Sequence, residues 1–223
     1  INRLSKMVKP NIAIITNIAE AHIENFKNVK GIAKAKSEII NNIQKNGIII
    51  LNRDDKFFNF LNQKAKSKNL KVVTFGKSKQ SDVCLIKTKK YGKIKKIITR
   101  VKDVTLKLQI EDINIYNVLA SLAVLKELEF NLEKTVQLLK NFRPSKGRGK
   151  VHKIKRYKRN FKLIDESYNA NPFSVKNALN NYSEIKKNNF KKYLLLGDML
   201  ELGKKSEFYH KELSKVINSS DID

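Results

Sequence analysis

Three short apolar runs, separated by helical patterns, constrain the fold of this chain more than any other feature. The runs are Ile12–Ile18, Gly47–Asn52 and Lys71–Phe75. Continuous apolar runs of this length predict strands that are buried on both faces of a parallel sheet. Helices are predicted between them, over about Val29–Lys45 and about Asp54–Lys68, and Asn46-Gly47 is a typical helix stop. The alternation predicts a doubly wound α/β unit.

The pattern changes between Asp82 and Ile110, where short alternating runs predict an antiparallel patch. The runs are Val83–Thr88, Ile94–Val101 and Val104–Ile110. Two helices are predicted next, and they cover about Asn114–Leu128 and Leu132–Asn141.

A segment of Pro, Gly and basic residues, Arg143–Gly149, is the predicted domain boundary. It divides the chain into a first domain over residues 1–145 and a second over residues 146–223. Beyond it, strands are expected near Val151–Lys155, Phe161–Asp165 and Tyr193–Leu196, and helices from Asn171-Pro172 and over about Lys205–Ile217. These strands are too few to complete a second sheet, and the chain begins without an initiator Met. We therefore expect an internal piece of a longer protein.

Composition limits the class of protein. With 223 residues, 41% of them apolar, the chain can bury a core. No run approaches the roughly 18 consecutive apolar residues that a membrane helix needs, so we expect no membrane span. The single cysteine, Cys84, cannot form an internal disulfide, and there is no cysteine cluster for zinc. A reducing cytoplasm is the expected location.

The formal net charge of +26 raises the question of a nucleic-acid partner, because phosphate neutralisation by Lys and Arg dominates such binding. Only seven of the 47 basic residues are arginine, which is the residue that reads phosphates and bases by paired hydrogen bonds. The lysines are also spread along the chain. An A+T-rich coding sequence explains this composition better than a polyanionic partner, so we expect no nucleic acid, although a basic binding module stays an alternative.

One helical lysine falls on an apolar face. Apolar residues between Val29 and Ile43 recur at helical spacing; Lys36 shares their face, whereas Lys34 joins the polar side. A lysine directed inward loses part of its preference for the charged form. Its neutral amine can react with CO2 to form a carbamate that binds Mg²⁺. Periodicity alone favours the simpler alternative, a lysine whose ammonium extends to the helix edge.

Two polar segments follow predicted strands. His22 comes just past the strand at Ile12–Ile18, at the end where parallel sheets bind ligands, but an ordinary loop histidine is the simpler alternative. Asp165 and Glu166 begin a polar strand-to-helix turn that suits ribose hydroxyls, a cation or an anion. Arg148, between two glycines, could reach a phosphate. A capped turn and a solvated arginine are the alternatives there.

The order and spacing of these segments resemble the Mur ligase family of ATP-dependent, amide-forming enzymes. Four segments are similar to its central ATPase domain, namely Thr16–His22, Ala33–Ile39, Leu51–Asp55 and the helix start Asn114–Ala120. The YNANP and GDMxELG motifs, in Asp165–Pro172 and Gly197–Gly203, resemble the Rossmann-like C-terminal domain of the branch that adds D-alanyl-D-alanine. The match runs essentially end to end.

The resemblance implies a cytoplasmic, monomeric enzyme whose substrates are UDP-N-acetylmuramoyl-tripeptide and D-alanyl-D-alanine. In this chemistry ATP phosphorylates the tripeptide carboxylate, and the dipeptide amine attacks the acyl phosphate. Mg²⁺ brings together two anionic groups, the carboxylate and the γ-phosphate.

The resemblance also implies residue roles. Lys36 matches a carbamylated lysine and His22 matches a metal ligand. Asn117 and Asn114 match nucleotide contacts, and Arg148 matches an arginine that reaches the phosphates. Glu166 matches an acidic ribose contact, with Tyr168 and Asn169 close to it.

The sequence departs from the family pattern in two respects. The family's His before Asn114 is Ile113 here, which puts the adenine contact in doubt. No glycine-rich phosphate loop occurs, so we expect no ligase activity from these residues alone. A Mur-type ligase for a different amino acid is the nearest alternative function.

Overall fold

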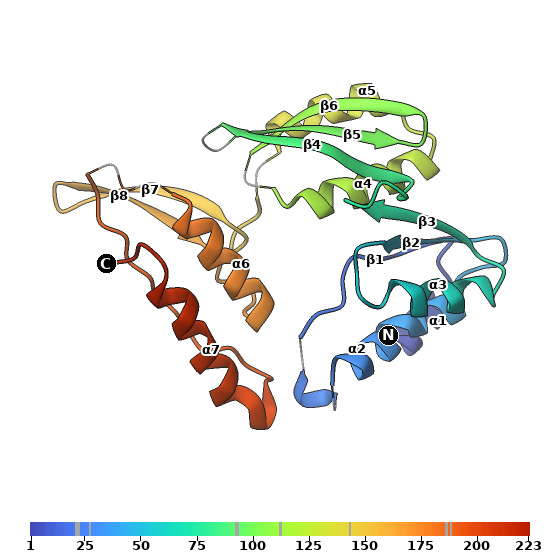
Figure 1. Cartoon of the computed structure of the whole chain (residues 1–223), viewed down its shortest axis with the longest axis horizontal. Coiled ribbons are helices and arrows are strands. Elements are labelled where there is room, and N and C mark those ends of the chain that lie inside the picture. Colours follow the sequence, from blue (N-terminus) through green and yellow to red (C-terminus); the bar gives the residue numbers. More distant parts are fainter. Residues whose placement is uncertain are drawn as a thin grey trace. The chain divides into compact units, whose positions relative to one another are not determined.

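The computed structural model describes residues 1–20, 23–26, 28–91, 94–111, 113–142, 144–185, 187 and 189–223 (Figure 1). His22 and Arg143 lie outside these residues. The chain forms two compact units, described separately below. The first contains Ile1–Ile18 and Ala33–Pro144, and the second contains Ala19–Ile32 and Ser145–Asp223.

The first unit is built on one mixed sheet of six strands in sequential order. The strands are β1 (Ile12–Ile15), β2 (Ile48–Asn52), β3 (Lys71–Gly76), β4 (Val83–Tyr91), β5 (Ile94–Val101) and β6 (Val104–Glu111). Pairing is parallel from β1 to β4 and antiparallel from β4 to β6. The α/β class, the parallel strands and the antiparallel patch are thus confirmed. The short parallel pairing of Phe75 and Gly76 with Val83 and Cys84 joins them into one sheet.

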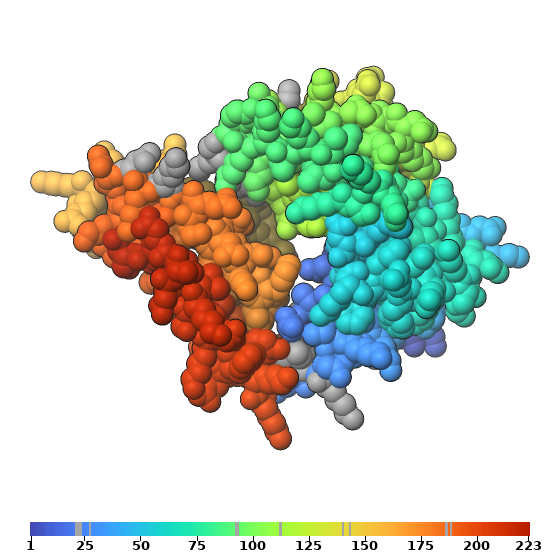
Figure 2. Space-filling view, viewed as in Figure 1, coloured from blue at the N-terminus to red at the C-terminus, as the bar shows by residue number. Residues whose placement is uncertain are grey.

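Both faces of β2, which lies between β1 and β3, are covered, whereas Ile14 of β1 is 36% exposed. Consecutive residues of a strand point to opposite faces, yet Ile49, Ile50 and Leu51 of β2 are all fully buried. On one face, α4 (Ile115–Glu127) and α5 (Leu132–Leu138) pack on the sheet, and Figure 1 shows them beneath and behind β4–β6. Elsewhere α3 (Phe58–Lys66) contacts β2 and β3. The space-filling view shows the cyan and green parts of this unit packed together (Figure 2).

Two predicted helices differ from the observed ones. The first is an α-helix, α2 (Val29–Ser37), followed by a 3-10 helix, η2 (Glu38–Asn42). The second, α3, begins at Phe58 rather than Asp54. The Asn52 side chain accepts the Asp54 N–H and the Asp55 carboxylate accepts the Phe57 N–H, and these bonds hold the stretch in turns. The N-terminal helix α1 (Asn2–Val8) was not predicted, and the predicted helix over Leu132–Asn141 is α5 followed by the 3-10 helix η3 (Leu139–Asn141).

The second unit contains an antiparallel hairpin and two α-helices. Its elements are β7 (Lys150–Arg156), β8 (Arg159–Asp165), α6 (Pro172–Ser183), α7 (Ser206–Asn218) and two 3-10 helices, η1 (Ile23–Asn25) and η4 (Gly203–Lys205). Asn171 caps α6 through a reciprocal capping box with Ser174, as the Asn-Pro signal predicted. Leu179, Met199, Leu202 and Leu213 form the small core.

The predicted strand at Tyr193–Leu196 is wrong. A strand needs a hydrogen-bonded neighbour, and within the described residues of this unit β7 and β8 pair only with each other. The segment instead has no regular secondary structure, and Lys192 just before it donates its backbone N–H to Asp223 Oδ2 at 2.7 Å. None of the helices within the described ranges is long and apolar enough to cross a membrane.

A fully buried lysine closes the end of α6. Lys192 is 0% exposed, and its Nζ lies 3.4 Å from the carbonyl oxygen of Tyr182 and 3.3 Å from that of Ser183. Its Nζ is also 3.7 Å from an Asp221 carboxylate oxygen. A cation at this position complements the carbonyls and the dipole of the helix C-terminus.

We therefore expect Lys192→Ala to lower the free energy of unfolding by about 2–4 kcal/mol, because it leaves a cavity and removes the donor to two carbonyls. Urea unfolding followed by circular dichroism measures this loss. The matched control is the exposed neighbour Lys191→Ala, which should change stability by no more than about 0.5 kcal/mol. Equal effects of the two substitutions would contradict the buried-cap explanation.

Candidate functional site

In the first unit, Lys36 reaches the loop that follows β1. Its side chain is half-buried, Lys34 is exposed, and Ala33 is fully buried, so α2 presents the faces that the periodicity predicted. Lys36 Nζ donates a hydrogen bond to the carbonyl oxygen of Asn17 at 2.9 Å. Burial lowers the pKa of Lys36, and the charge of Asp55 partly opposes that shift. The amine is therefore easier to deprotonate than that of an exposed lysine, which favours its reaction as a nucleophile.

Asp55 is a member of this group that sequence reasoning did not single out. One carboxylate oxygen accepts the backbone N–H of Ile18 at 2.7 Å, and the other accepts that of Phe57 at 2.8 Å. Asp55 thus ties the loop after β1 to the turn after β2, at the carboxyl ends of two adjacent parallel strands. Ligands bind at this end of open α/β sheets. The signal available in the sequence was its position directly after a buried strand.

The predicted metal ligand His22 lies outside the described residues, so its role stays a prediction. Across the described ranges, no three His, Cys, Asp or Glu side chains gather in a way that could hold a metal ion. The Asn17 carbonyl oxygen nevertheless lies 2.9 Å from Lys36 Nζ, and the charge of Asp55 acts on the same amine. Oxygen ligands of this kind suit Mg²⁺.

The predicted nucleotide contacts Asn114 and Asn117 lie at the start of α4. Asn114 is the helix N-cap, and its side-chain oxygen accepts the backbone N–H of Tyr116 at 2.8 Å. The cap uses only the side-chain oxygen of Asn114 and not its NH2 group. Asn117 is exposed in the first turn. Ile113, at the position of the family histidine, packs against the core cluster instead, so this departure serves folding at that position.

In the second unit, the turn Gly147-Arg148-Gly149 is hydrogen-bonded to the turn that follows β8. Gly149 N donates to the Asp165 carbonyl oxygen at 2.8 Å, and Tyr168 N donates to the Gly147 carbonyl oxygen at 3.1 Å. A carboxylate oxygen of Asp165 also accepts the Gly147 N–H at 3.0 Å. Both glycines have left-handed φ angles, 77° and 83°, which favour glycine. The end of the predicted boundary segment is therefore part of the second unit.

This pairing brings three predicted residues together. The Arg148 guanidinium lies 4.1 Å from the centroid of the Tyr168 ring, within range of a cation–π interaction. Desolvation raises the pKa of Glu166, the charge of Asp165 raises it further, and Arg148 lowers it. Asn169 is exposed in the same turn. A guanidinium beside a carboxylate and an aromatic ring can bind a phosphate, a ribose and a flat ring.

His210 of α7 holds the GDMLELG segment and was not predicted. Its Nδ1 lies 2.8 Å from the Ser206 carbonyl oxygen. A carbonyl oxygen can only accept a hydrogen bond, so Nδ1 carries the proton and donates. Its Nε2 then accepts the backbone N–H of Met199 at 3.1 Å. Within the same unit, Glu24 N donates to the Glu201 carbonyl oxygen at 3.0 Å. No local pattern in the sequence pairs a helical histidine with a loop N–H eleven residues away.

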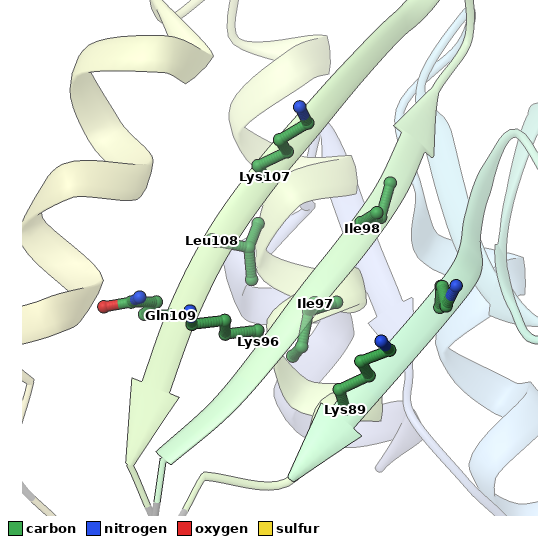
Figure 3. A pocket seen from close by; sticks show the side chains of 8 residues that line it. Lys89, Lys96, Ile97, Ile98, Lys107, Leu108 and Gln109 are labelled. Atoms are coloured by element: carbon green, nitrogen blue, oxygen red, sulfur yellow. The ribbon is translucent and has the colours of Figure 1, made fainter. Parts of the chain in front are cut away.

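A shallow pocket of about 530 Å³ lies on the face of strands β4–β6 shown in Figure 3, and none of the residues described above lines it. Its lining residues are Lys87, Lys89, Lys96, Ile97, Ile98, Lys107, Leu108 and Gln109. Four lysines from three adjacent strands thus meet on one sheet face. This many lysines on one face is expected in a chain that carries lysine at most of the surface positions where the residue type is not constrained. None of the predicted site residues lines the pocket.

Comparison with known proteins gives a consistent pattern. The Mur ligase middle domain model matches residues 1–125. The UDP-N-acetylmuramoyl-tripeptide–D-alanyl-D-alanine ligase of Rickettsia prowazekii is 33% identical over 217 residues, which are 96% of this chain and 47% of that protein. A MurF structure from Acinetobacter baumannii, 28% identical, superposes with a TM-score of 0.85 over 100% of this chain and 47% of its own.

The fold is also that of MurF from Thermotoga maritima in complex with ADP, which is 24% identical, with a TM-score of 0.81 over 99% of this chain and 49% of that chain. The chain spans about half the length of the relatives it matches.

The close approach of the two turns gives a test of the second unit. A side chain added at Gly147 would lie 2.9 Å from the backbone nitrogen of Tyr168, and its φ would be strained. We expect Gly147→Ala to cost about 1–3 kcal/mol in the free energy of unfolding. Gly197→Ala is the matched control, because nothing lies within 4 Å of the added atom there. Urea unfolding of both variants checks this; equal stabilities would show that the turn pairing is not tight.

Proposed function

The chain belongs to the Mur ligase family, and on that premise we propose that the protein carrying it is an ATP-dependent ligase. It joins D-alanyl-D-alanine to UDP-N-acetylmuramoyl-tripeptide through an acyl phosphate, in the synthesis of peptidoglycan precursors. The observation that carries the proposal is the similarity of nearly the whole chain to UDP-N-acetylmuramoyl-tripeptide–D-alanyl-D-alanine ligases, including 33% identity to the Rickettsia prowazekii enzyme. We assign residues 1–145 to the ATP-binding middle domain and residues 146–223 to the beginning of the C-terminal domain. The enzyme acts as a monomer in the cytoplasm.

Lys36 has the chemistry that a carbamylated lysine needs. Its amine has a lowered pKa, and the half-buried side chain donates a hydrogen bond to the Asn17 carbonyl oxygen. Attack of the neutral amine on CO2 forms a nitrogen–carbon bond and releases one proton, so the side chain then ends in a carboxylate. That carboxylate, together with His22, would hold Mg²⁺. When bound, Mg²⁺ neutralises the charge that develops between the tripeptide carboxylate and the γ-phosphate.

The nucleotide contacts fall into two groups of residues. At the start of α4, Asn117 and the free amide group of Asn114 are available as hydrogen-bond partners. In the second unit, Arg148 would bind the phosphates and Glu166 the ribose hydroxyls, with Tyr168 and Asn169 beside them. The stacked pair of Arg148 and Tyr168 supports this assignment, because stacking holds the guanidinium in place without using its N–H donors. The ADP complex of the Thermotoga maritima relative supports a nucleotide as the ligand.

Substrate choice tests the proposed reaction. The full-length protein should release phosphate from ATP when UDP-N-acetylmuramoyl-tripeptide and D-alanyl-D-alanine are both present. Omission of either should reduce the rate to background, because the acyl phosphate forms on one and is consumed by the other. Phosphate release that depends on a single amino acid, and not on the dipeptide, would instead identify a different Mur-type ligase. Tight binding of nucleic acid that weakens steeply with salt, without ligation, would favour the basic binding module.

Lys36 gives a chemical test on the same enzyme. Lys36→Ala should lower kcat by more than the roughly 10- to 100-fold cost of losing a group that only orients a metal ligand. Added acetate or formate should restore part of the activity, since a small carboxylate can replace the carbamate. Lys34→Ala, on the exposed side of the same helix, is the control and should leave kcat within about twofold. An active Lys36→Ala variant would rule out the carbamate.

A further inference from the structure

Asp54 collects hydrogen bonds from two other segments of the first unit. One carboxylate oxygen accepts the backbone N–H of Lys77 at 2.5 Å and the Tyr116 hydroxyl at 3.1 Å. The other accepts the N–H of Ser78 at 3.1 Å. A side chain at Gly76 would lie 2.8 Å from this carboxylate, so the end of β3 approaches it as closely as glycine permits. Asp54 therefore joins the turn after β2, the turn after β3 and the start of α4.

The tyrosine in this cluster is held on two sides. Tyr116 is half-buried, and the Lys77 ammonium lies 5.4 Å from the centroid of its ring. Burial raises the pKa of Tyr116 to about 12, and the charge of Asp54 and the hydrogen bond to it act in the same direction. The hydroxyl is thus protonated at neutral pH and donates to a charged acceptor, which makes a stronger hydrogen bond than a neutral pair.

Tyr116 sits between the two proposed nucleotide contacts in the first turn of α4. Its backbone N–H is bonded to the side-chain oxygen of Asn114, and Asn117 N donates to the Asn114 carbonyl oxygen at 3.1 Å. The first turn of a helix lacks the full set of intrahelical hydrogen bonds and frays most easily. The side-chain bond from Tyr116 to Asp54 anchors this turn to the carboxyl ends of β2 and β3. The backbone bonds of Asn114 and Asn117 then fix both asparagines relative to that edge.

We propose that Tyr116, through its hydrogen bond to Asp54, is a positioning residue for nucleotide binding at the start of α4. Its hydroxyl anchors this turn by a hydrogen bond. Ile113, which stands at the position of the family histidine, has an apolar side chain and cannot form such a bond. The inference rests on the proposed function, because it takes the ligand at Asn114 and Asn117 to be a nucleotide. It adds a residue and a hydrogen bond to that site, spanning 62 positions of the sequence.

The test uses the full-length protein and the variant Tyr116→Phe, which removes only the hydroxyl. The expected result is a rise of about tenfold in the Kd for ATP, measured by titration calorimetry, and in the KM for ATP. The kcat should stay within about twofold, because the reacting groups are untouched. Tyr91→Phe is the matched control, since its ring also lies near a lysine ammonium, that of Lys96 at 5.1 Å, but on a different sheet edge. That variant should bind ATP normally.

A second variant separates positioning from stability. Asp54→Asn should also weaken ATP binding, and Tyr116→Phe should add little to it, because both changes remove one hydrogen bond. An unchanged Kd for ATP in Tyr116→Phe overturns the proposal, whether or not Tm falls. Additive effects in the double variant also overturn it. If the unsubstituted protein itself fails to bind ATP, the proposed function fails; normal ATP binding with an unaffected Tyr116→Phe refutes this inference alone.

Discussion

Burial of both faces of β2, the strand between β1 and β3, is the constraint on which the first unit depends. Ile49, Ile50 and Leu51 leave β2 no solvent-facing side, so polar groups can gather only where the strands end. Parallel pairing places those ends at one edge, and the turn after β2 supplies two carboxylates that accept backbone N–H groups of neighbouring segments. Asp55 binds the loop after β1, and Asp54 binds the turn after β3. The chemistry proposed for Lys36 and for the start of α4 relies on these two side chains.

The second unit also fixes a group of polar residues, but it does so by hydrogen bonds between two turns. With a core of four buried side chains, it holds its polar turn through backbone pairing between residues 147–149 and 165–168. The left-handed glycines permit the close approach, and Asp165 accepts N–H groups from both turns. Arg148 is consequently close enough to Tyr168 to stack on its ring. Holding an arginine in one position lowers the entropy cost of binding an anion.

Sequence patterns predicted elements well where the evidence is local. The strands of the first unit, the Asn171-Pro172 helix start and the inward face of α2 follow from periodicity and capping, which act over a few residues. The predicted strand at Tyr193–Leu196 was wrong, because strand formation depends on a neighbour that periodicity cannot supply. Helix α3 began later than predicted because the side chains of Asn52 and Asp55 accept backbone N–H groups of its expected first turn.

The sequence by itself determined the α/β class, the family resemblance and the identity of the candidate residues, since each depends on residue type and spacing. It left Lys36 and Arg148 each with two interpretations. Only the tertiary structure showed that Lys36 is half-buried against the Asn17 carbonyl and that Arg148 is stacked on Tyr168. It alone revealed Asp55, His210 and the bond from Tyr116 to Asp54. The physical reason is that these contacts join segments distant in the chain, and packing of the whole unit decides which distant groups meet.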